Sequence, residues 1–582
     1  MEAGKRTVRD IFNRGRNLEI PFFQRAYVWE EPQWERFLED MRLVTDTRRP
    51  YFLGSVILKQ QDTESDRDSL LTVIDGQQRL TTLNIFMKVL CLKRGEDGDF
   101  TEIFKKQRDK SIILLHNFND EAAFNEVVRL KALTPFEGVS DSDHIRRAFN
   151  YFLREITDAD VEGTLNFYDI VDNLLFVGID LARDEDEQQI FDTINSLGVR
   201  LTTAELLKNY FFNRDERAAY IEHWRDVFET DDETKRYWDR EVTTGRLRRT
   251  FIDLFFNAYL QIKIQDPNVH VRTEDKLEFA RLNNLFESYK RMVSKYHMDK
   301  AEMLAEIKEY AQLFRAHFDY DVVNRALTGE SGIERIVAII FGLETSTVIP
   351  YVLYLLKHSP AGAERNELFG LLETYLMRRM VAKRNSKDYN KLFTDRLVGA
   401  QVTTPAAFRE FLEDIRNSHN AQPNDADLWR GFEHSVIVNK QTRGIIYLLE
   451  SAMRDERRHA TQLLGLHHYS LEHLMPKKWK NNWPGPGNAA DEDERRTKLK
   501  TLGNLAIIPQ TLNTSIRDAN WPTKKEGQGN RHGLRHYASG LETLSPYMDL
   551  PHWDEKTIVD RAEDLYGVAL TVWAYAGVGV ES

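Results

Sequence analysis

The amino-acid sequence predicts a mostly helical α+β protein with several domains. Its 582 residues suffice for two to four domains that each bury a core. Strand-like apolar runs occur in the N-terminal third, whereas residues 213–368 have almost only the pattern of amphipathic helices. We therefore expect an N-terminal α+β domain at 1–213, a helical connecting domain at 214–368 and a last domain at 369–582.

Three strands and two helices are expected in the N-terminal domain. The second strand ends at Asp75-Gly76, and residues 77–90 then have helical spacing. A second helix is expected after the third strand, because the acidic run at 184–187 suits the positive end of a helix. The expected strands are residues 51–58, 70–74 and 176–181.

Bulky apolar residues at helical spacing mark the expected core of the helical region. The most apolar stretch, residues 336–356, is interrupted by a polar run at 344–347 and by Pro350. It falls short of the roughly 20 consecutive apolar residues that a membrane span requires, so we expect buried helix. A helix containing Arg378 and Arg379 should open the last domain. The expected core residues are Trp224, Phe228, Phe251, Phe255, Leu285, Leu313 and Phe314.

Composition narrows the classes of function. The single cysteine, Cys91, excludes an internal disulfide framework and a cysteine-rich zinc site. Residues 1–17 are polar and basic and lack the apolar segment of a signal peptide. We therefore expect a cytoplasmic protein without a membrane partner. The net charge of −12 argues against a protein that coats nucleic acid indiscriminately, although a local basic cleft is compatible with it.

Four polar residues near the C-terminus form the first candidate site. His473 is the candidate general base for hydrolysis of a phosphodiester, because an imidazole can accept the proton of water. Asn504 follows Gly503 in a strand-like run and should hydrogen-bond the loop that holds His473. Glu472 and Asn513 offer oxygen ligands, which favour Mg²⁺ or Mn²⁺. Neighbouring strand residues point to opposite faces, so Glu472 reaches this site only if the strand twists or turns there.

The surroundings of these residues decide between a plain and a functional interpretation. His473 alone would be interpreted as a core histidine, and Asn504 alone as a turn residue. Their order and spacing together favour a nuclease centre. Many basic residues lie between His473 and His536, and some of them should contact DNA phosphates. Those expected to do so are Lys477, Lys478, Lys524 and Lys525.

A second candidate site combines residues 20–29 with residues 73–83 of the N-terminal domain. In the second segment a strand ends, Gly76 allows a tight turn, and a helix begins. Free backbone N–H groups, the positive helix end and the Arg79 guanidinium together favour a phosphate site. No G-x-x-x-x-G-K-[ST] motif is present, so a nucleotide would be held without a P-loop. The expected nucleotide-binding residues are Gln24, Arg25, Asp75, Gly76, Gln77, Gln78, Arg79, Lys208 and Asn209.

These N-terminal residues have plainer interpretations as well. Asp75-Gly76 alone is a β-turn, residues 77–79 are a solvated helical turn, and Lys208-Asn209 is a helix cap. Tyr27 and Trp29 are either core aromatics or stacking faces for an extruded, modified base.

Both sites resemble parts of one nuclease family. Residues 472–476, 503–505 and 512–513 are similar to the GmrD-like branch of the His-Me finger (ββα-metal, HNH-type) nucleases. Residues 20–29 and 73–83, followed by a third similar segment at 189–210, closely resemble GmrS-like domains of the ParB/sulfiredoxin-like class. Asn513 stands where many members of the wider superfamily carry histidine, which implies modest metal affinity.

The resemblance implies a modification-dependent restriction endonuclease of antiphage defence. Its N-terminal domain would bind and hydrolyse a nucleoside triphosphate, GTP or another, with Asp75 as a metal- or water-orienting carboxylate. Nucleotide turnover and the sensing of modified double-stranded DNA would control metal-dependent cleavage at His473, in an HNH-type domain embedded in helices.

Two alternatives stay open: a ParB-like, nucleotide-switched DNA-binding regulator with an inactive nuclease domain, and an RNA-cleaving toxin. The recognised modification (glucosylated hydroxymethylcytosine, hydroxymethylcytosine or phosphorothioate), the preferred nucleotide, the direction of its control and the formation of a homodimer also stay open.

Overall fold

The computed structural model divides the chain into two compact units, Met1–Ile221 and Glu222–Ser582. Strands and helices alternate in the first unit, and helices predominate in the second. The structure describes residues 2–13, 16–21, 26–60, 69–181, 203–212, 216–244, 247–279, 285–454, 462–509, 518–529, 531–538 and 540–576.

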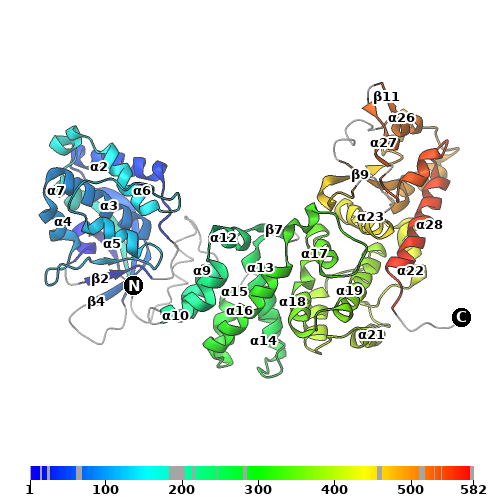
Figure 1. Cartoon of the computed structure of the whole chain (residues 1–582), viewed down its shortest axis with the longest axis horizontal. Helices are drawn as coiled ribbons and strands as arrows, with labels where there is room; N and C mark the ends of the chain where they lie inside the picture. Colours follow the sequence, from blue (N-terminus) through cyan, green and yellow to red (C-terminus); the bar gives the residue numbers. More distant parts are fainter. Residues whose placement is uncertain are drawn as a thin grey trace. The chain divides into compact units, whose positions relative to one another are not determined.

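A six-stranded mixed sheet organises the first unit (Figure 1). Its strands lie in the order β1-β6-β3-β4-β2-β5. β1 pairs antiparallel with β6 and β3 antiparallel with β4, whereas the other neighbouring pairs are parallel. The strands are β1 (Glu2–Thr7), β2 (Arg16–Glu19), β3 (Tyr51–Gln60), β4 (Ser69–Asp75), β5 (Leu114–Leu115) and β6 (Leu174–Leu181).

The three strands predicted in this unit are confirmed as β3, β4 and β6. β1, β2 and β5 were missed, because β1 and β2 are mainly polar and β5 has only two residues. These strands are specified by pairing with apolar neighbours rather than by an apolar pattern of their own.

The main core of this unit joins β3, β4 and β6 to the helices packed on them. α3 confirms the helix predicted after Gly76, and every residue from Gln77 to Cys91 is buried except Arg79. Its first turn is therefore not a solvated one. The helix expected after β6 lies outside the described residues. The helices are α1 (Val8–Ile11), α2 (Glu31–Thr47), α3 (Gln77–Arg94), α4 (Asp97–Phe104), α5 (Glu121–Arg129), α6 (His144–Glu155), α7 (Phe167–Asn173), α9 (Thr203–Phe211) and α10 (Arg217–Tyr220).

Helices build most of the second unit, as predicted for its first part. An antiparallel hairpin of β7 (Glu241–Thr244) and β8 (Leu247–Thr250) was not predicted, because both strands are mainly polar. Of the expected core residues, Leu313 is partly exposed and the other six are buried. The first helices are α11 (Asp226–Phe228), α12 (Asp232–Trp238), α13 (Phe251–Lys263), α14 (Thr273–Phe279), α15 (Leu285–Lys295) and α16 (Lys300–His317).

The most apolar stretch of the sequence forms two buried helices, α17 (Ile333–Gly342) and α18 (Ile349–His358), which confirms the predicted buried helix. Glu344 lies in the turn between them with a positive φ of 58°. Within the described ranges, every helix is too short or too polar to span a membrane.

α19 (Ala363–Val381) ties the helical region to the C-terminal part of the unit. Arg335 of α17 forms a buried bidentate ion pair with Glu373 of α19, at 2.8 and 2.6 Å, and donates to Ser451 Oγ at 2.7 Å. Glu373 also accepts a hydrogen bond from Trp573 Nε1 at 3.0 Å. The predicted boundary after residue 368 falls inside α19, and this network joins both of its sides in one core. The three-domain division stays a prediction.

The C-terminal part carries an antiparallel pair, β9 (Tyr469–His473) and β10 (Leu505–Pro509), in which His473 lies opposite Leu505. α23 (Asn439–Met453) packs against both strands. The expected ββα arrangement stays a prediction, because residues 510–517, which follow the pair, lie outside the described residues. The remaining elements are α20 (Tyr389–Lys391), α21 (Pro405–Asp414), α22 (Asp425–His434), α24 (Ala489–Lys498), α26 (Trp521–Glu526), β11 (Gly527–Gln528), β12 (Arg531–His532), α27 (Leu534–Ala538) and α28 (Glu555–Val572).

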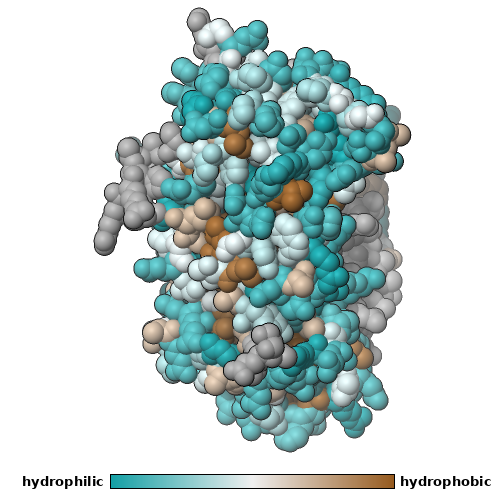
Figure 2. All heavy atoms as spheres, turned by 90° about the vertical axis from the view of Figure 1, so that its right-hand side faces the viewer, coloured by the Kyte–Doolittle hydropathy of each residue, from teal (hydrophilic) through white to brown (hydrophobic). Residues whose placement is uncertain are grey.

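The face of the molecule in Figure 2 is largely hydrophilic, with small and separate apolar patches. Val438 and Leu464 are among the exposed large apolar residues of the second unit. Scattered residues of this kind are ordinary on protein surfaces and mark no interface by themselves.

Candidate active site

A pocket of about 500 Å³ opens where β9 ends. An imidazole, two carboxylates and two lysines meet there, so the pocket combines a proton acceptor, oxygen donors and cations. Four of the predicted site residues are brought together in it, and the sequence analysis missed Asp518. The lining residues are Glu472, His473, Pro476, Lys477, Lys478 and Asp518.

His473 ends β9 and is partly exposed to this pocket. Burial, together with the positive charges of Lys477 and Lys524, lowers the pKa of its imidazole to about 4. The imidazole is therefore unprotonated at neutral pH. In that form one ring nitrogen carries a lone pair that can accept a proton.

Glu472 is 6% exposed and lines the same pocket as its neighbour His473, because the strand ends there. Its Oε1 accepts a charged hydrogen bond from Lys524 Nζ, which also donates to the carbonyl oxygen of His473 at 2.7 Å. Burial raises the pKa of the Glu472 carboxyl, and the lysine opposes that shift.

Asn504 fastens the turn that follows His473, as predicted. Its Oδ1 accepts the N–H of Met475 at 2.8 Å, and its Nδ2 donates to the carbonyl oxygens of Met475 at 2.9 Å and Leu499 at 3.0 Å. Trp553 Nε1 donates to the same Oδ1 at 3.1 Å. A buried carboxamide with four such bonds holds two chain segments in one geometry.

α28 in turn holds the Gly503-Asn504 turn. Arg561 is fully buried in this helix and donates from Nη1 to the carbonyl oxygens of Leu502, Gly503 and Leu505 at 3.2, 2.9 and 2.8 Å. Burial lowers the pKa of its guanidinium to about 10. A Cβ atom on Gly503 would lie 2.0 Å from the carbonyl oxygen of Ile558, so only glycine allows this approach.

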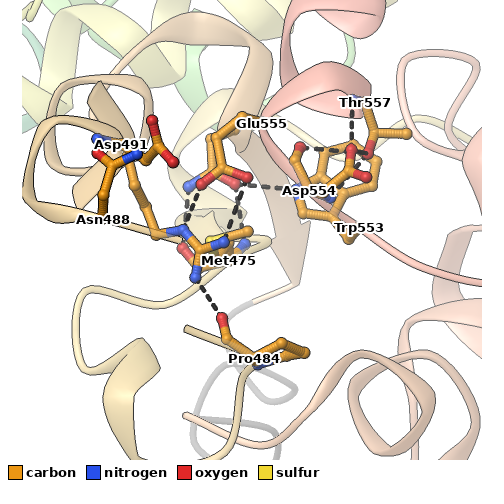
Figure 3. A network of polar contacts seen from close by, with 10 residues as sticks. Met475, Pro484, Asn488, Asp491, Trp553, Asp554, Glu555 and Thr557 are labelled. Atoms are coloured by element: carbon orange, nitrogen blue, oxygen red, sulfur yellow. Dashed lines mark hydrogen bonds and ion pairs between the residues drawn. The ribbon is translucent and has the colours of Figure 1, made fainter. Parts of the chain in front are cut away.

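A second arginine, Arg495, stabilises the chain that follows the pocket residues. Arg495 donates from Nη1 to the carbonyl oxygen of Pro484 at 2.6 Å and pairs with Glu555 in the first turn of α28 (Figure 3). Its guanidinium also stacks over the Trp479 ring, 4.7 Å from the centroid. Asp518 accepts a hydrogen bond from Asn481 Nδ2 at 3.0 Å, which fixes one wall of the pocket.

The four lysines predicted to contact DNA divide into two pairs. Lys477 and Lys478 are exposed and line the pocket, as a phosphate contact requires. Lys524 is 0% exposed and bound to Glu472. Lys525 donates to the carbonyl oxygen of Leu550 at 3.1 Å. In this structure α26 turns both ammonium groups towards the protein, so the prediction of phosphate contacts is not supported for them.

The pocket contains part of the donor set expected for a divalent cation. Glu472 supplies a carboxylate, which suits Mg²⁺ or Mn²⁺, and Asn513, the second expected ligand, lies outside the described residues. Within the described ranges, no group of three or more histidine, cysteine, aspartate or glutamate side chains is placed to hold a metal ion. The donor chemistry of Glu472 fits the cation, and its charge is balanced by Lys524.

In the first unit, Asp75 and Arg79 face each other across the first turn of α3. Arg79 Nη2 donates to Asp75 Oδ2 at 2.9 Å and to the carbonyl oxygen of Ser55 at 2.7 Å. Gly76 caps the helix with a φ of +100°, and a Cβ there would lie 2.9 Å from Val56 Cγ2. Gln77 Oε1 and Arg79 Nε are buried and lack a hydrogen-bond partner in the part of the chain that the structure describes. Both atoms lie at this helix end.

Gln78 links residues 73–83 to residues 20–29, because its Oε1 accepts the N–H of Val28 at 2.9 Å. Tyr27 is 2% exposed, and its hydroxyl contacts Thr82 Oγ1 at 2.6 Å and Trp34 Nε1 at 2.8 Å. The Tyr27 ring thus belongs to the core and offers no face to a base in this structure, in line with the core interpretation. Trp29 is partly buried against the same core.

The remaining predicted nucleotide contacts are only partly described. Lys208 lies on α9 and is buried. Asn209 lies on the same helix, and Gln24 and Arg25 lie outside the described residues. A shallow pocket of about 880 Å³ lies along α5, and its described lining includes Phe118, Arg129 and Arg217 but none of the predicted nucleotide contacts.

The residues that the sequence analysis missed mainly position other residues of the candidate site. Lys524 was expected to contact a DNA phosphate, and its pairing with Glu472 had no signal in the sequence. Asp518 lies outside every motif. The role of Arg561 could have been predicted, because a single arginine within an apolar helical pattern indicates a buried cation with several carbonyl partners.

Two family models match the chain. Residues 8–212 match the N-terminal domain of the GmrSD restriction endonuclease, and residues 422–568 match the C-terminal domain of GmrSD restriction endonucleases. The first match contains the Asp75–Arg79 helix end, and the second contains the pocket at His473. Among curated proteins, no match was found.

Proposed function

The chain belongs to the GmrSD restriction endonuclease family, and we propose that it cleaves modified double-stranded DNA at the His473 pocket. Membership of this family supports an endonuclease role in restriction, with DNA as the substrate. The observation that carries the finer proposal is the pocket itself, in which the unprotonated His473 imidazole lies beside the Glu472 carboxylate and two exposed lysines.

In the proposed reaction, the oxygen of a water molecule bonds to the phosphorus, and the bond to the leaving sugar oxygen breaks. His473 accepts the proton of that water. Lys477 and Lys478 bind phosphate oxygens and align the strand in the pocket. Asn504 keeps the His473 turn in place through its bonds to Met475.

Glu472 and Asn513 are the residues that would hold a Mg²⁺ or Mn²⁺ ion, whose charge would stabilise the phosphoryl oxygens. The carboxylate of Glu472 at the pocket wall supports this assignment. The second ligand rests on the family resemblance of residues 512–513.

We further propose that the first unit binds a nucleoside triphosphate, GTP or another, at the start of α3. Support comes from Gln77 Oε1 and Arg79 Nε, two buried polar atoms without a hydrogen-bond partner among the described residues, which lie beside the positive end of an 18-residue helix. Turnover of that nucleotide and recognition of modified DNA would control cleavage in the second unit.

A cleavage panel tests the proposal. Purified protein is incubated with RNA and with DNA carrying cytosine, hydroxymethylcytosine, glucosylated hydroxymethylcytosine or phosphorothioate links, with and without Mg²⁺ and each triphosphate. We expect cleavage of a modified DNA that requires the divalent ion. Retention of DNA without nicking would indicate a regulator instead, and cleavage of RNA alone would indicate a toxin.

His473→Ala should lower the cleavage rate by about two orders of magnitude or more, as expected for loss of a general base. His468→Ala is the matched control, because His468 is an exposed histidine just before β9. Melting temperature and nucleotide hydrolysis should stay unchanged in both variants. Undiminished cleavage by His473→Ala would remove His473 from the reaction.

A further inference from the structure

Lys524 provides a cation inside the candidate nuclease site. α26 carries it, and its ammonium group is 0% exposed. The group hydrogen-bonds the Glu472 carboxylate and the carbonyl oxygen of His473, so it touches the two residues that the proposed function uses most.

The buried Lys524 ammonium and Glu472 carboxylate each compensate the charge of the other. An ionised carboxylate that is removed from water is strongly disfavoured unless a cation or several donors balance it. Lysine provides a compact single charge on a flexible stem, and here that charge lies where a divalent cation would otherwise neutralise Glu472. Two cations at the same carboxylate would repel each other.

We propose that the Lys524 ammonium is an internal cation that occupies the Glu472 carboxylate until a divalent ion binds, and that it leaves the carboxylate on binding. This inference rests on the proposed function, because it takes Glu472 as a metal ligand. It makes the ion compete with a tethered charge, which weakens metal affinity and keeps the site stable without metal.

Lys525 offers a matched control on the same helix. Its Nζ donates to the carbonyl oxygen of Leu550 at 3.1 Å rather than to Glu472. Lys525→Met therefore removes one positive charge from α26 without freeing the carboxylate.

The first experiment measures Mn²⁺ binding to the full chain by electron paramagnetic resonance, together with the melting temperature. Lys524→Met should bind Mn²⁺ about tenfold more tightly than the wild type, because a repelling charge is gone. Without metal it should melt at a lower temperature, because Glu472 is left uncompensated. Lys525→Met should match the wild type in affinity. Equal or weaker Mn²⁺ binding by Lys524→Met overturns the proposal.

The second experiment uses the wild-type chain and does not depend on the folding of a variant. An amine-reactive reagent is applied with and without Mg²⁺, and mass spectrometry compares Lys524 with Lys525. Labelling of Lys524 should rise several-fold with Mg²⁺, and unchanged labelling contradicts release of the ammonium.

Glu472→Gln should abolish Mn²⁺ binding. Binding that persists in this variant overturns the assignment of the ion to Glu472. The DNA cleavage panel separates the two claims. If DNA is cleaved but Lys524→Met binds Mn²⁺ no better, only the competition is wrong. If Mn²⁺ binding changes as expected but DNA stays intact, only the nuclease function is wrong.

Discussion

Asp120 carries a carboxyl group into the core of the first unit. Its Oδ2 accepts the N–H of Tyr27 at 2.6 Å and a hydrogen bond from Asn117 Nδ2 at 3.1 Å. Burial raises the pKa of this carboxyl from 3.8 to about 6, although those bonds oppose the shift. Between these two values the folded chain holds a proton that the unfolded chain has lost. The stabilisation of the folded chain by this retained proton is therefore complete below about pH 4. It is lost as pH rises through 6.

The first prediction follows from this titration. Asp120→Asn keeps an acceptor for Tyr27 but cannot ionise, so the variant avoids the loss of about 3 kcal/mol that the wild type undergoes as pH rises from about 4 to 6. The free energy of unfolding, measured in urea at pH 4.5, 6 and 7.5, should shift in favour of the variant as pH rises. A difference between the two proteins that stays constant over this range would contradict the assigned pKa.

The second prediction concerns Asn504. Asn504→Ala leaves the N–H and carbonyl groups of Met475 and the Trp553 N–H without their partner, which should cost about 3 kcal/mol of unfolding free energy. The His473 turn would also lose its anchor, so cleavage should fall at temperatures where the variant stays folded. Asn488→Ala removes only the N-cap of the exposed helix α24 and should cost about 1 kcal/mol with cleavage unchanged. Equal cleavage by the two variants would show that Asn504 only stabilises the fold.

For single residues, the sequence predicts a hydrogen-bonding role better than it predicts burial. The bonding of Asn504 to the His473 turn could be predicted, because a carboxamide after glycine in a strand-like run has few other partners. The burial of Tyr27 and the pairing of Lys524 could not be predicted, because tertiary packing decides which face of an amphipathic side chain meets solvent.

Among the elements, α28 has the closest contact with the turn that carries Asn504 in the candidate active site. It lies against the 3-10 turn Leu502–Asn504 so tightly that Gly503 has no space for a side chain. This contact and the three carbonyl bonds of Arg561 fix where β10 begins. The position of Asn504 therefore depends on a helix more than 50 residues further along the chain.

The third prediction tests this packing. Gly503→Ala would place a methyl group within 2.0 Å of the Ile558 carbonyl oxygen and should cost about 3 kcal/mol, because backbone must move to admit it. Gly567→Ala on α28 meets no atom within 4 Å and should be neutral or stabilising by up to about 1 kcal/mol. Urea unfolding compares the two variants, and similar midpoints would show that α28 can shift freely.

Elements with their own apolar pattern could be predicted from the sequence. β3, β4, β6 and α3 carry such patterns and were found close to their observed bounds. β7 and β8 are polar strands that pair only with each other, so neither periodicity nor composition marks them.

For the whole molecule, the sequence indicates the two candidate sites more clearly than it indicates the domain boundary between them. Motifs mark both candidate sites because their residue types follow from chemistry. Boundaries instead depend on which helices share a core. α19 packs against α17, α21, α22 and α23, on both sides of the boundary predicted after residue 368. The buried pair Arg335–Glu373 crosses it as well.

The fourth prediction is that residues 222–582 fold as one cooperative unit and residues 369–582 do not. Cutting after 368 divides α19 and leaves Glu373 without Arg335, and breaking a buried pair in this way costs about 3–5 kcal/mol. The cut also exposes apolar faces that α17 covers. The fragment 222–582 should show one sharp thermal transition by circular dichroism, whereas 369–582 should melt earlier and broadly, or aggregate. Glu373→Gln in the longer fragment should lower its melting temperature for the same electrostatic reason. If the two fragments melted alike, the last 214 residues would form a domain of their own, and the core drawn through α19 would contribute little to their stability.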